Sequence, residues 1–367
     1  MRPVEPIPAP HSFSASPSVP RISQRFEQTT RRLIGLFVPS RFKNASQSTS
    51  GPVEVVSAIP AALLKAEVEA LPVEQTLVYS GKLRVLYARA SQIPWCLQEL
   101  GRLREISFRA AGEGTGRASD IDVFDDHYLH LFVWDTKAET IVGAYRMGLT
   151  DEILARYGKR GLYTQSLFKY STRVLQSLNP AIELGRSFVR SEYQRSYSAL
   201  MLLWCGIAHF VERYPRYAVL FGAVSISNSY DPVSRQLILE YLKANTVEIE
   251  LARHVKARQR FPRRKMLAIE PGELAGLKSI DDLSRLVARI EPDAKGVPVL
   301  LRQYLKLGGR LLGFSADAQF SNTLDGLIKV DLRNSSLKVL GRYMSAEGAA
   351  AFLAYHGAEP PLLRRAS

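Results

Sequence analysis

The fold is decided by the stretch Ala181–Val189, which reads AIELGRSFV, and by the two segments that follow it. A polar turn leads to the apolar segment 198–214 (SALMLLWCGIAHFVERY), and then to 217–224 (YAVLFGAV). Short apolar runs bounded by polar turns predict strands at the first and third segments. The middle segment suits a buried helix, because a bilayer span needs about 20 consecutive apolar residues. Strand, helix and strand in this order predict an α/β domain.

The same alternation continues on both sides of this unit. Upstream, the patterns predict a helix at 91–111, a polar loop at 112–126, and strands at 77–80, 83–88, 129–134 and 141–149. Downstream, they predict a strand at 326–331 that closes the domain. The domain is therefore expected to span 76–335.

The segments outside this core are assigned from their composition. Residues 1–56 are predicted to be a flexible extension rich in Pro and Ser, with a basic amphipathic segment at 21–43 that suits an anionic membrane or a docked helix. A helical lead-in is expected at 57–75, and a helical basic insertion at 231–295. A C-terminal helix and tail are expected at 336–367.

The bulk composition excludes some classes and leaves others open. The chain has 367 residues, 46% of them hydrophobic, so wholesale disorder is excluded. Its formal net charge of +14 indicates an acidic partner, which can be nucleic acid, an anionic bilayer or an acidic protein. Two cysteines exclude a disulfide framework and a Cys-based zinc site, and no metal site is predicted. A reducing cytoplasm fits this cysteine usage, and no signal peptide is recognised.

Three motifs carry candidate chemistry, and they occur in a fixed order. The first pairs a helix bearing Arg104 and Phe108 with an acidic loop that contains Asp120, Asp122 and Asp125. The second is GAYR at 143–146, which ends in Arg146, and the third is the stretch that holds Glu183 and Arg186. Carboxylates suit proton transfer, and guanidinium groups suit bidentate binding of a carboxylate.

In this order, the motifs resemble the ornithine-lipid and hemolysin-like branch of the GNAT-superfamily N-acyltransferases. This branch is related to acyl-homoserine-lactone and N-acyl amino acid synthases, and the resemblance covers about residues 76–335. It implies a GNAT-like mixed α/β fold with a splayed central sheet flanked by helices. It also implies transfer of a fatty acyl group from the phosphopantetheine thioester of an acyl carrier protein to an amino acid acceptor such as ornithine or glycine. The product would be a lyso-aminolipid, and no bound cofactor is implied.

One departure from the GNAT pattern concerns the loop that cradles the pyrophosphate of coenzyme A. GNAT proteins that use acetyl-CoA have glycines there, which let backbone N–H groups approach the phosphates. The corresponding residues here are 194–199, QRSYSA, and Tyr197 stands where the first glycine is expected. The departure therefore favours a phosphopantetheine carried by a protein.

The chemistry of acyl transfer suggests a role for each motif residue. Glu183 is the first candidate for the base, acting directly or through a water, unless it only pairs with Arg146 or Arg186. Either arginine suits the carboxylate of the acceptor. The three aspartates suit a cationic side chain of the acceptor, or an ion pair with Arg104. Further candidates for substrate binding are Phe108, Ser187, Ser225 and Ser227, and the last two also suit ordinary turn chemistry.

A basic segment between 251 and 269 contains no acidic residue. Its cations are Arg253, Lys256, Arg258, Arg260, Arg263, Arg264 and Lys265. We expect it to dock an acyl carrier protein or an anionic membrane, with a solvated helix face as the plainer alternative. Nucleic acid is not expected as a partner, because no binding module is recognised. The expected location is the cytoplasm, including the inner membrane face.

Two other functions remain open. The same donor would also serve a synthase of a secreted signal, such as an acyl-homoserine lactone or an N-acyl amino acid. A catalytically silent module that keeps the fold and binds a carrier protein or a membrane is the second alternative.

Overall fold

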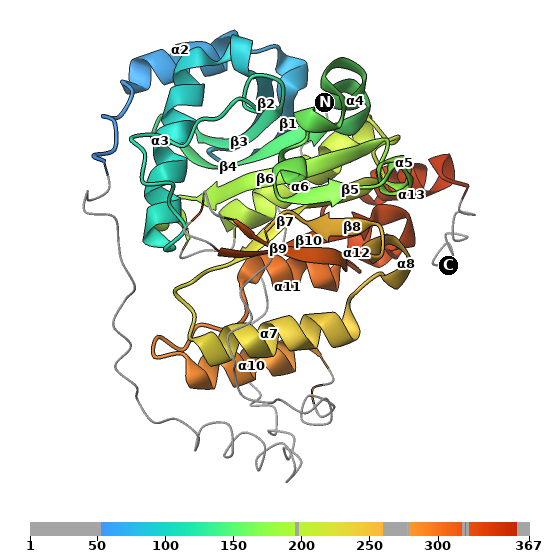
Figure 1. Ribbon diagram of the computed structural model, residues 1–367. Helices are drawn as coiled ribbons and strands as arrows, with labels where there is room; N and C mark the ends of the chain where they lie inside the picture. Colours follow the sequence, from blue (N-terminus) through green and yellow to red (C-terminus); the bar gives the residue numbers. More distant parts are fainter. Residues whose placement is uncertain are drawn as a thin grey trace, which may run out of the picture.

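The computed structural model describes residues 53–194, 198–259, 277, 279–317, 320 and 323–357. Within them an eight-stranded sheet has the order β1-β2-β3-β4-β6-β7-β10-β9 (Figure 1). Its strands are β1 Thr76–Ser80, β2 Leu83–Arg89, β3 Leu129–Asp135, β4 Thr140–Leu149, β6 Ala181–Val189, β7 Val219–Ile226, β9 Arg310–Asp317 and β10 Thr323–Asp331. The predicted amphipathic segment at 21–43 lies outside the described residues, as does Tyr197.

The sheet is antiparallel except between β6 and β7, which run parallel. These two strands pair only at their beginnings, from Ala181 with Val219 to Glu183 with Phe221. Beyond that point β6 continues to pair with β4 up to Val189, whereas β7 continues to pair with β10 up to Ile226. The two strands therefore separate in the middle of the sheet, as the resemblance to GNAT proteins implies.

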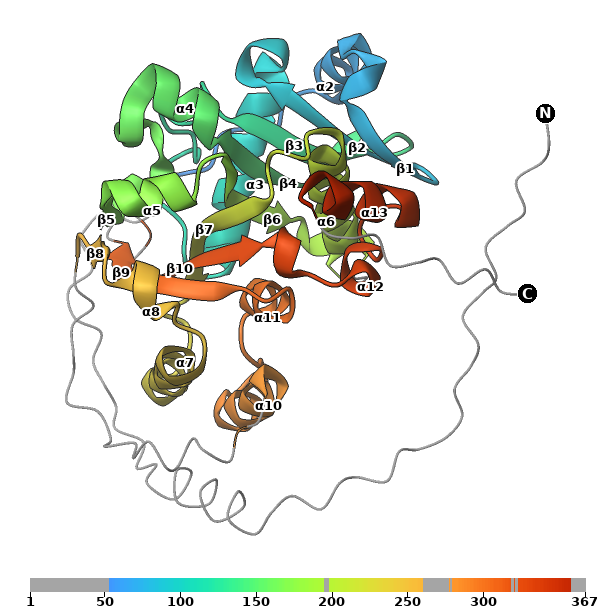
Figure 2. The same cartoon turned by 90° about the vertical axis from the view of Figure 1, so that its right-hand side faces the viewer.

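Helices cover both faces of the sheet. Helices α2 (Ala61–Ala70) and α3 (Pro94–Ala110) form one core with β2, β3 and β4, in which Leu100 and Phe132 are fully buried. The apolar helix α6 (Ser198–Arg213) packs on the opposite face, and α13 (Ala346–Tyr355) lies beside it (Figure 2). The predicted buried helix at 198–214 is thus confirmed. No described helix is both long and apolar enough to cross a bilayer.

The second half of the chain adds helices and a small sheet. Helices α7 (Pro232–Asn245) and α10 (Ile280–Ile290) lie side by side, and α11 (Val299–Lys306) packs near them (Figure 1). The other α-helices of the described residues are α4 Thr150–Tyr157, α5 Thr172–Ser177, α8 Ile249–Ala252 and α12 Leu337–Leu340. Strands β5 (Phe168–Tyr170) and β8 (Val255–Ala257) form a two-stranded sheet. The 231–295 segment therefore contains a strand as well as helices, which the sequence did not suggest.

A glycine sits at the point where β6 and β7 separate. A Cβ atom on Gly222 would overlap the carbonyl oxygen of Leu184, whereas a Cβ atom on Gly185 would meet no atom within 4 Å. Gly222→Ala is therefore expected to lower the free energy of unfolding by about 1–3 kcal/mol, because the strand backbones must move apart. Urea unfolding will measure the loss, with Gly185→Ala as the matched control. Equal stability of the two variants would contradict this explanation.

Candidate active site

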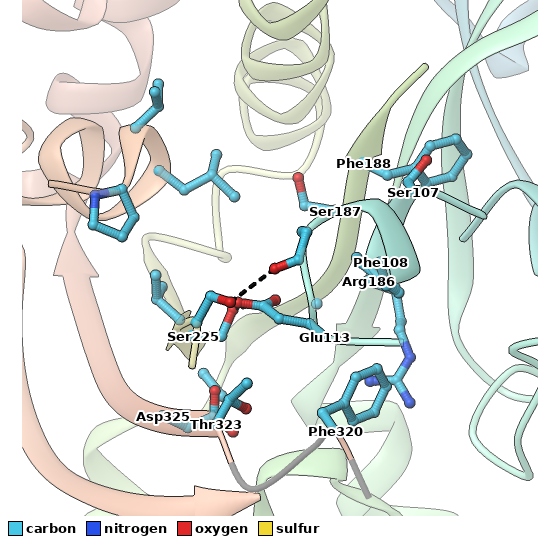
Figure 3. A pocket seen from close by; sticks show the side chains of 18 of the residues that line it. Ser107, Phe108, Glu113, Arg186, Ser187, Phe188, Ser225, Phe320, Thr323 and Asp325 are labelled. Carbon is cyan, nitrogen blue, oxygen red and sulfur yellow. Dashed lines mark hydrogen bonds between the residues drawn. The ribbon is translucent and has the colours of Figure 1, made fainter. Parts of the chain in front are cut away.

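A cavity of about 730 Å³ opens where β6 and β7 separate. Its wall is formed by the second half of β6, the end of β7, the end of α3, the start of α11 and the β9–β10 hairpin. Five of the predicted site residues line it, and most of them are seen in Figure 3: Phe108, Arg186, Ser187, Ser225 and Ser227. The other predicted residues of the motifs, Arg104, Asp120, Asp122, Asp125, Arg146 and Glu183, do not line it.

The lining combines apolar and acidic parts. Helices α6 and α11 contribute apolar side chains that suit an alkyl chain, namely those of Leu200, Val299 and Leu300. The acidic part consists of Glu113, Asp293, Asp317 and Asp325, and the cationic side chains of the lining are Arg186 and Lys295. In Figure 3 the Glu113 side chain reaches Ser225, and Asp325 lies next to Thr323. A cavity of this composition suits a ligand with one apolar arm and a polar end that carries a cationic group for the acids.

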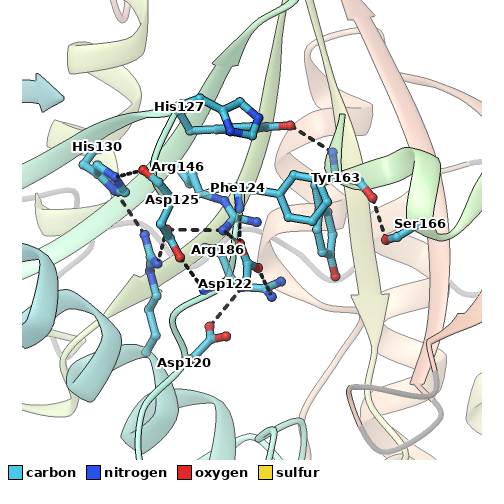
Figure 4. Close-up of polar contacts among 12 residues, drawn as sticks. Asp120, Asp122, Phe124, Asp125, His127, His130, Arg146, Tyr163, Ser166 and Arg186 are labelled. Carbon is cyan, nitrogen blue, oxygen red and sulfur yellow. Dashed lines mark hydrogen bonds and ion pairs between the residues drawn. The ribbon is translucent and has the colours of Figure 1, made fainter. Parts of the chain in front are cut away.

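The motif residues outside the cavity form a buried network of charges (Figure 4). Arg104 Nη1 lies 2.7 Å from Asp125 Oδ1, and both side chains are fully buried. His130 Nε2 donates to the carbonyl oxygen of Asp125 at 3.0 Å, so its Nδ1 accepts from Arg104. Burial, helped by Arg104, lowers the pKa of His130 to about 4, so the imidazole stays neutral. Arg104 therefore has the structural pairing that the sequence left as one of two alternatives.

Arg146 and Arg186 extend the same network and are already paired. Arg146 Nη1 lies 2.6 Å from Asp122 and 3.2 Å from Asp125. Arg186 contacts Asp120 through Nε and Asp122 through Nη2, both at 2.9 Å. Arg146 is 1% exposed and does not line the cavity, so its predicted binding of the acceptor carboxylate is not supported by its position.

Arg186 reaches the cavity because of an irregularity in β6. Between Gly185 and Phe188 this strand has one residue more than β4 opposite it, which makes a β-bulge. Arg186 adopts a φ of 50°, in the left-handed region that ordinary residues rarely occupy. Its guanidinium lies 4.3 Å from the ring centre of Phe320 and 4.7 Å from that of Tyr163. The bulge thus turns Arg186 towards the acidic loop and the aromatic wall of the cavity.

Glu183 does not line the cavity, and its carboxylate is bound by Tyr128 and by residues 163 and 164. Its Oε1 accepts from the backbone N–H of Thr164 at 2.6 Å and from the hydroxyl of Thr164. Its Oε2 accepts from the hydroxyl of Tyr128 and from the backbone N–H of Tyr163 at 3.1 Å. Burial raises the pKa of Glu183, and these hydrogen bonds oppose the rise. A carboxylate held by four donors, 1% exposed and outside the cavity, does not have the position of the predicted base.

Sequence reasoning missed the acidic part of the cavity. Glu113 lies in the polar loop predicted at 112–126, and the sequence predicts no strand at Asp317, although β9 ends at this residue. Asp325 lies in β10, where a carboxylate among apolar residues was a usable signal. The register brings Thr323 opposite Asp317, and Asp325 opposite Ser225. The pairing of β10 with β9 and with β7 brings Asp317 and Asp325 to one cavity, and this pairing is not visible in the sequence.

Comparisons with known proteins agree with this architecture. Residues 103–204 match the model of an acetyltransferase (GNAT) domain. The chain is 37% identical to a glycine N(alpha)-acyltransferase of Phocaeicola vulgatus over 202 residues, which is 52% of this chain and 61% of that protein. It is also 37% identical to a glycine N(alpha)-acyltransferase of Bacteroides thetaiotaomicron over 209 residues, or 59% of that protein. The chain thus spans about three fifths of the length of these two relatives.

A third relative is matched over more of its length. The L-ornithine N(alpha)-acyltransferase of Rhizobium meliloti is 30% identical over 255 residues, which is 67% of this chain and 77% of that protein. Among solved structures, a CoA-dependent acyl-homoserine lactone synthase with SAM and isopentyl-CoA matches with a TM-score of 0.35 and 12% identity, over 71% of this chain and 89% of that one. On the GNAT domain and the extent of the ornithine match, this chain belongs to the family of GNAT N-acyltransferases.

Proposed function

We propose that the protein transfers a fatty acyl group from a thioester to the α-amino group of an amino acid. The observation that supports this most is the cavity between the separated halves of β6 and β7. Its apolar lining from α6 and α11 suits an acyl chain, and its acids suit an ammonium group. An amino acid and a thioester can therefore meet inside one cavity.

The backbone of β6 supports the second requirement of the reaction. When an amine attacks a thioester, the carbonyl oxygen gains negative charge and needs N–H donors. Among the described residues the ladder between β6 and β7 ends at Glu183, so beyond it the edge of β6 that faces β7 is not used for pairing with that strand. We propose that this edge, between Leu184 and Val189, supplies such donors. Arg186 is proposed to hold Phe320 and the acidic loop against the site.

The proposed donor is an acyl carrier protein, and the proposed product is a lyso-aminolipid. The support for the carrier protein is the basic segment around β8, in which Arg253 and Lys256 are exposed. Arg258 is exposed as well, and its Nε donates to the carbonyl oxygen of Gln165 at 2.6 Å. The other four cations of this segment, Arg260, Arg263, Arg264 and Lys265, lie outside the described residues.

The function is tested with purified protein and a panel of amino acids that includes glycine and ornithine. A long-chain acyl carrier thioester and the matching acyl-CoA are supplied in parallel, and products are identified by mass spectrometry. We expect an N-acyl amino acid and an equal amount of free thiol, with higher turnover from the carrier thioester. Absence of product with every acceptor and both donors would contradict acyl transfer. In cells that express the protein, a ninhydrin-positive lipid supports the aminolipid, and a secreted amide supports the signal.

The docking surface yields a separate prediction. Replacing Arg253 and Lys256 by glutamate is expected to raise the KM for acyl carrier protein about tenfold at low salt, because the carrier is acidic. The KM for acyl-CoA is expected to change less than about twofold, since CoA does not need the protein contact. Lys137→Glu, in the exposed turn between β3 and β4, is the control. An unchanged KM for the carrier at low salt would show that these two cations do not bind it.

A further inference from the structure

The end of α3 places a carboxylate in the cavity with a defined geometry. The backbone N–H of Glu113 donates to the carbonyl oxygen of Phe108 at 2.8 Å, and that of Gly112 to Arg109 at 3.0 Å. Gly112 has a φ of 74°. This is the Schellman arrangement that ends a helix and fixes the residue after the glycine. Glu113 is therefore held by the backbone of α3.

The end of β7 fixes the same residue from the other side. Ser225 Oγ donates to Glu113 Oε2 at 2.7 Å, and Ser227 Oγ donates to the carbonyl oxygen of Ala111 at 2.7 Å. Figure 3 shows the hydrogen bond between Ser225 and Glu113 among the residues that line the cavity. Glu113 thus lies where β6 and β7 have separated, which is the proposed position of the thioester.

The surroundings of Glu113 favour a cationic ligand. Burial, together with the charge of Asp317, raises the pKa of the Glu113 carboxyl. Asp325 lines the same cavity and is 5% exposed, and the pKa of this carboxyl is also raised by burial and by the neighbouring acids. The hydroxyl of Thr323, which also lines the cavity, is fully buried and has no hydrogen-bond partner among the described residues. A polar ligand group is therefore expected beside Thr323 and Asp325.

We infer that Glu113, rather than Glu183, is the base that takes a proton from the ammonium group of the acceptor. The inference rests on the proposed function and assigns its proton transfer to a residue in the cavity. Glu113 accepts one proton, and the neutral amine nitrogen then forms a bond to the thioester carbon. As the carbon–sulfur bond breaks, the second proton lost by the nitrogen goes to the sulfur, which leaves as a thiol. Glu113 finally releases its proton to solvent.

The test is the pH dependence of kcat/KM for the acceptor in the Glu113→Gln variant. We expect the plateau to fall by about 10²–10⁴-fold, the range that a general base contributes, and the acid limb to disappear. The KM for the thioester is expected to stay within about threefold. Glu240→Gln, the same chemical change on the exposed face of α7, is the control and should leave the profile unchanged.

Ser225→Ala provides a readout that a merely structural role would not give. The Ser225 hydroxyl stabilises the charged form of Glu113, so its loss should raise the pKa of Glu113 further. The acid limb is then expected to move to higher pH, whereas a Ser225 that only supports the fold would leave the position of this limb unchanged. A Glu113→Gln variant that keeps both the plateau and the acid limb of the wild type would overturn the inference and leave the acyltransferase function standing. If the wild type forms no product, the function fails and the inference fails with it.

Discussion

Replacing Asp125 by asparagine is expected to lower the free energy of unfolding by about 3–5 kcal/mol. The carboxylate is fully buried and lies within 2.7 Å of Arg104 and 3.2 Å of Arg146. Burial alone would raise the pKa of Asp125, but the two arginines hold it well below its usual range. The asparagine removes the negative charge and leaves both guanidinium groups buried with less compensation, which is the costly way to break such a pair.

Urea unfolding at neutral pH measures this loss. The matched control is Glu139→Gln, which breaks the partly exposed ion pair with Lys65 and should change stability by less than about 1 kcal/mol. A double variant, Asp125→Asn with Arg104→Met, is expected to be less destabilised than the sum of the single changes, because the two groups interact directly. Equal losses for Asp125→Asn and Glu139→Gln would show that the network does not stabilise the fold.

The fold was predicted well where one local pattern decides an element. The predicted strand at 83–88 corresponds to β2, and the predicted helix at 91–111 corresponds to α3. The separation of β6 from β7 came from the resemblance to GNAT proteins, since nothing in either strand alone shows it. The strand β9 was not predicted, and Gly308 and Gly309, which directly precede it, are typical of a loop.

The candidate site was predicted less well, because its geometry depends on long-range contacts. The sequence identified three aspartates and three arginines as a group, but it gave no way to pair them. In the structure they pair mainly with one another, and this satisfies their charges inside the core. Glu113 escaped notice because Ser225, its partner, is 112 residues away. A charged residue can therefore suit catalysis by its type and still be buried and paired in the core, and the sequence alone does not separate these two cases.

The second prediction concerns Glu183, which has a structural role if Glu113 is the base. Glu183→Gln is expected to lower the free energy of unfolding by about 1–3 kcal/mol, because a buried donor loses its acceptor. Each oxygen of Glu183 accepts a backbone N–H, from Thr164 on Oε1 and from Tyr163 on Oε2. An amide has one oxygen, so in either orientation its NH₂ group must face one of these N–H donors.

Activity separates this structural role from a catalytic one. At a temperature where the variant is folded, Glu183→Gln is expected to keep the acid limb of the pH profile, and Glu113→Gln is expected to lose it. The reason is position, since the hydrogen bonds of Glu183 hold Tyr128 and the 163–164 turn, whereas Glu113 lines the cavity. Thr164→Ser keeps the hydroxyl donor to Glu183 and serves as the control for the turn. Wild-type stability with loss of turnover and of the acid limb in Glu183→Gln would instead return the proton transfer to Glu183.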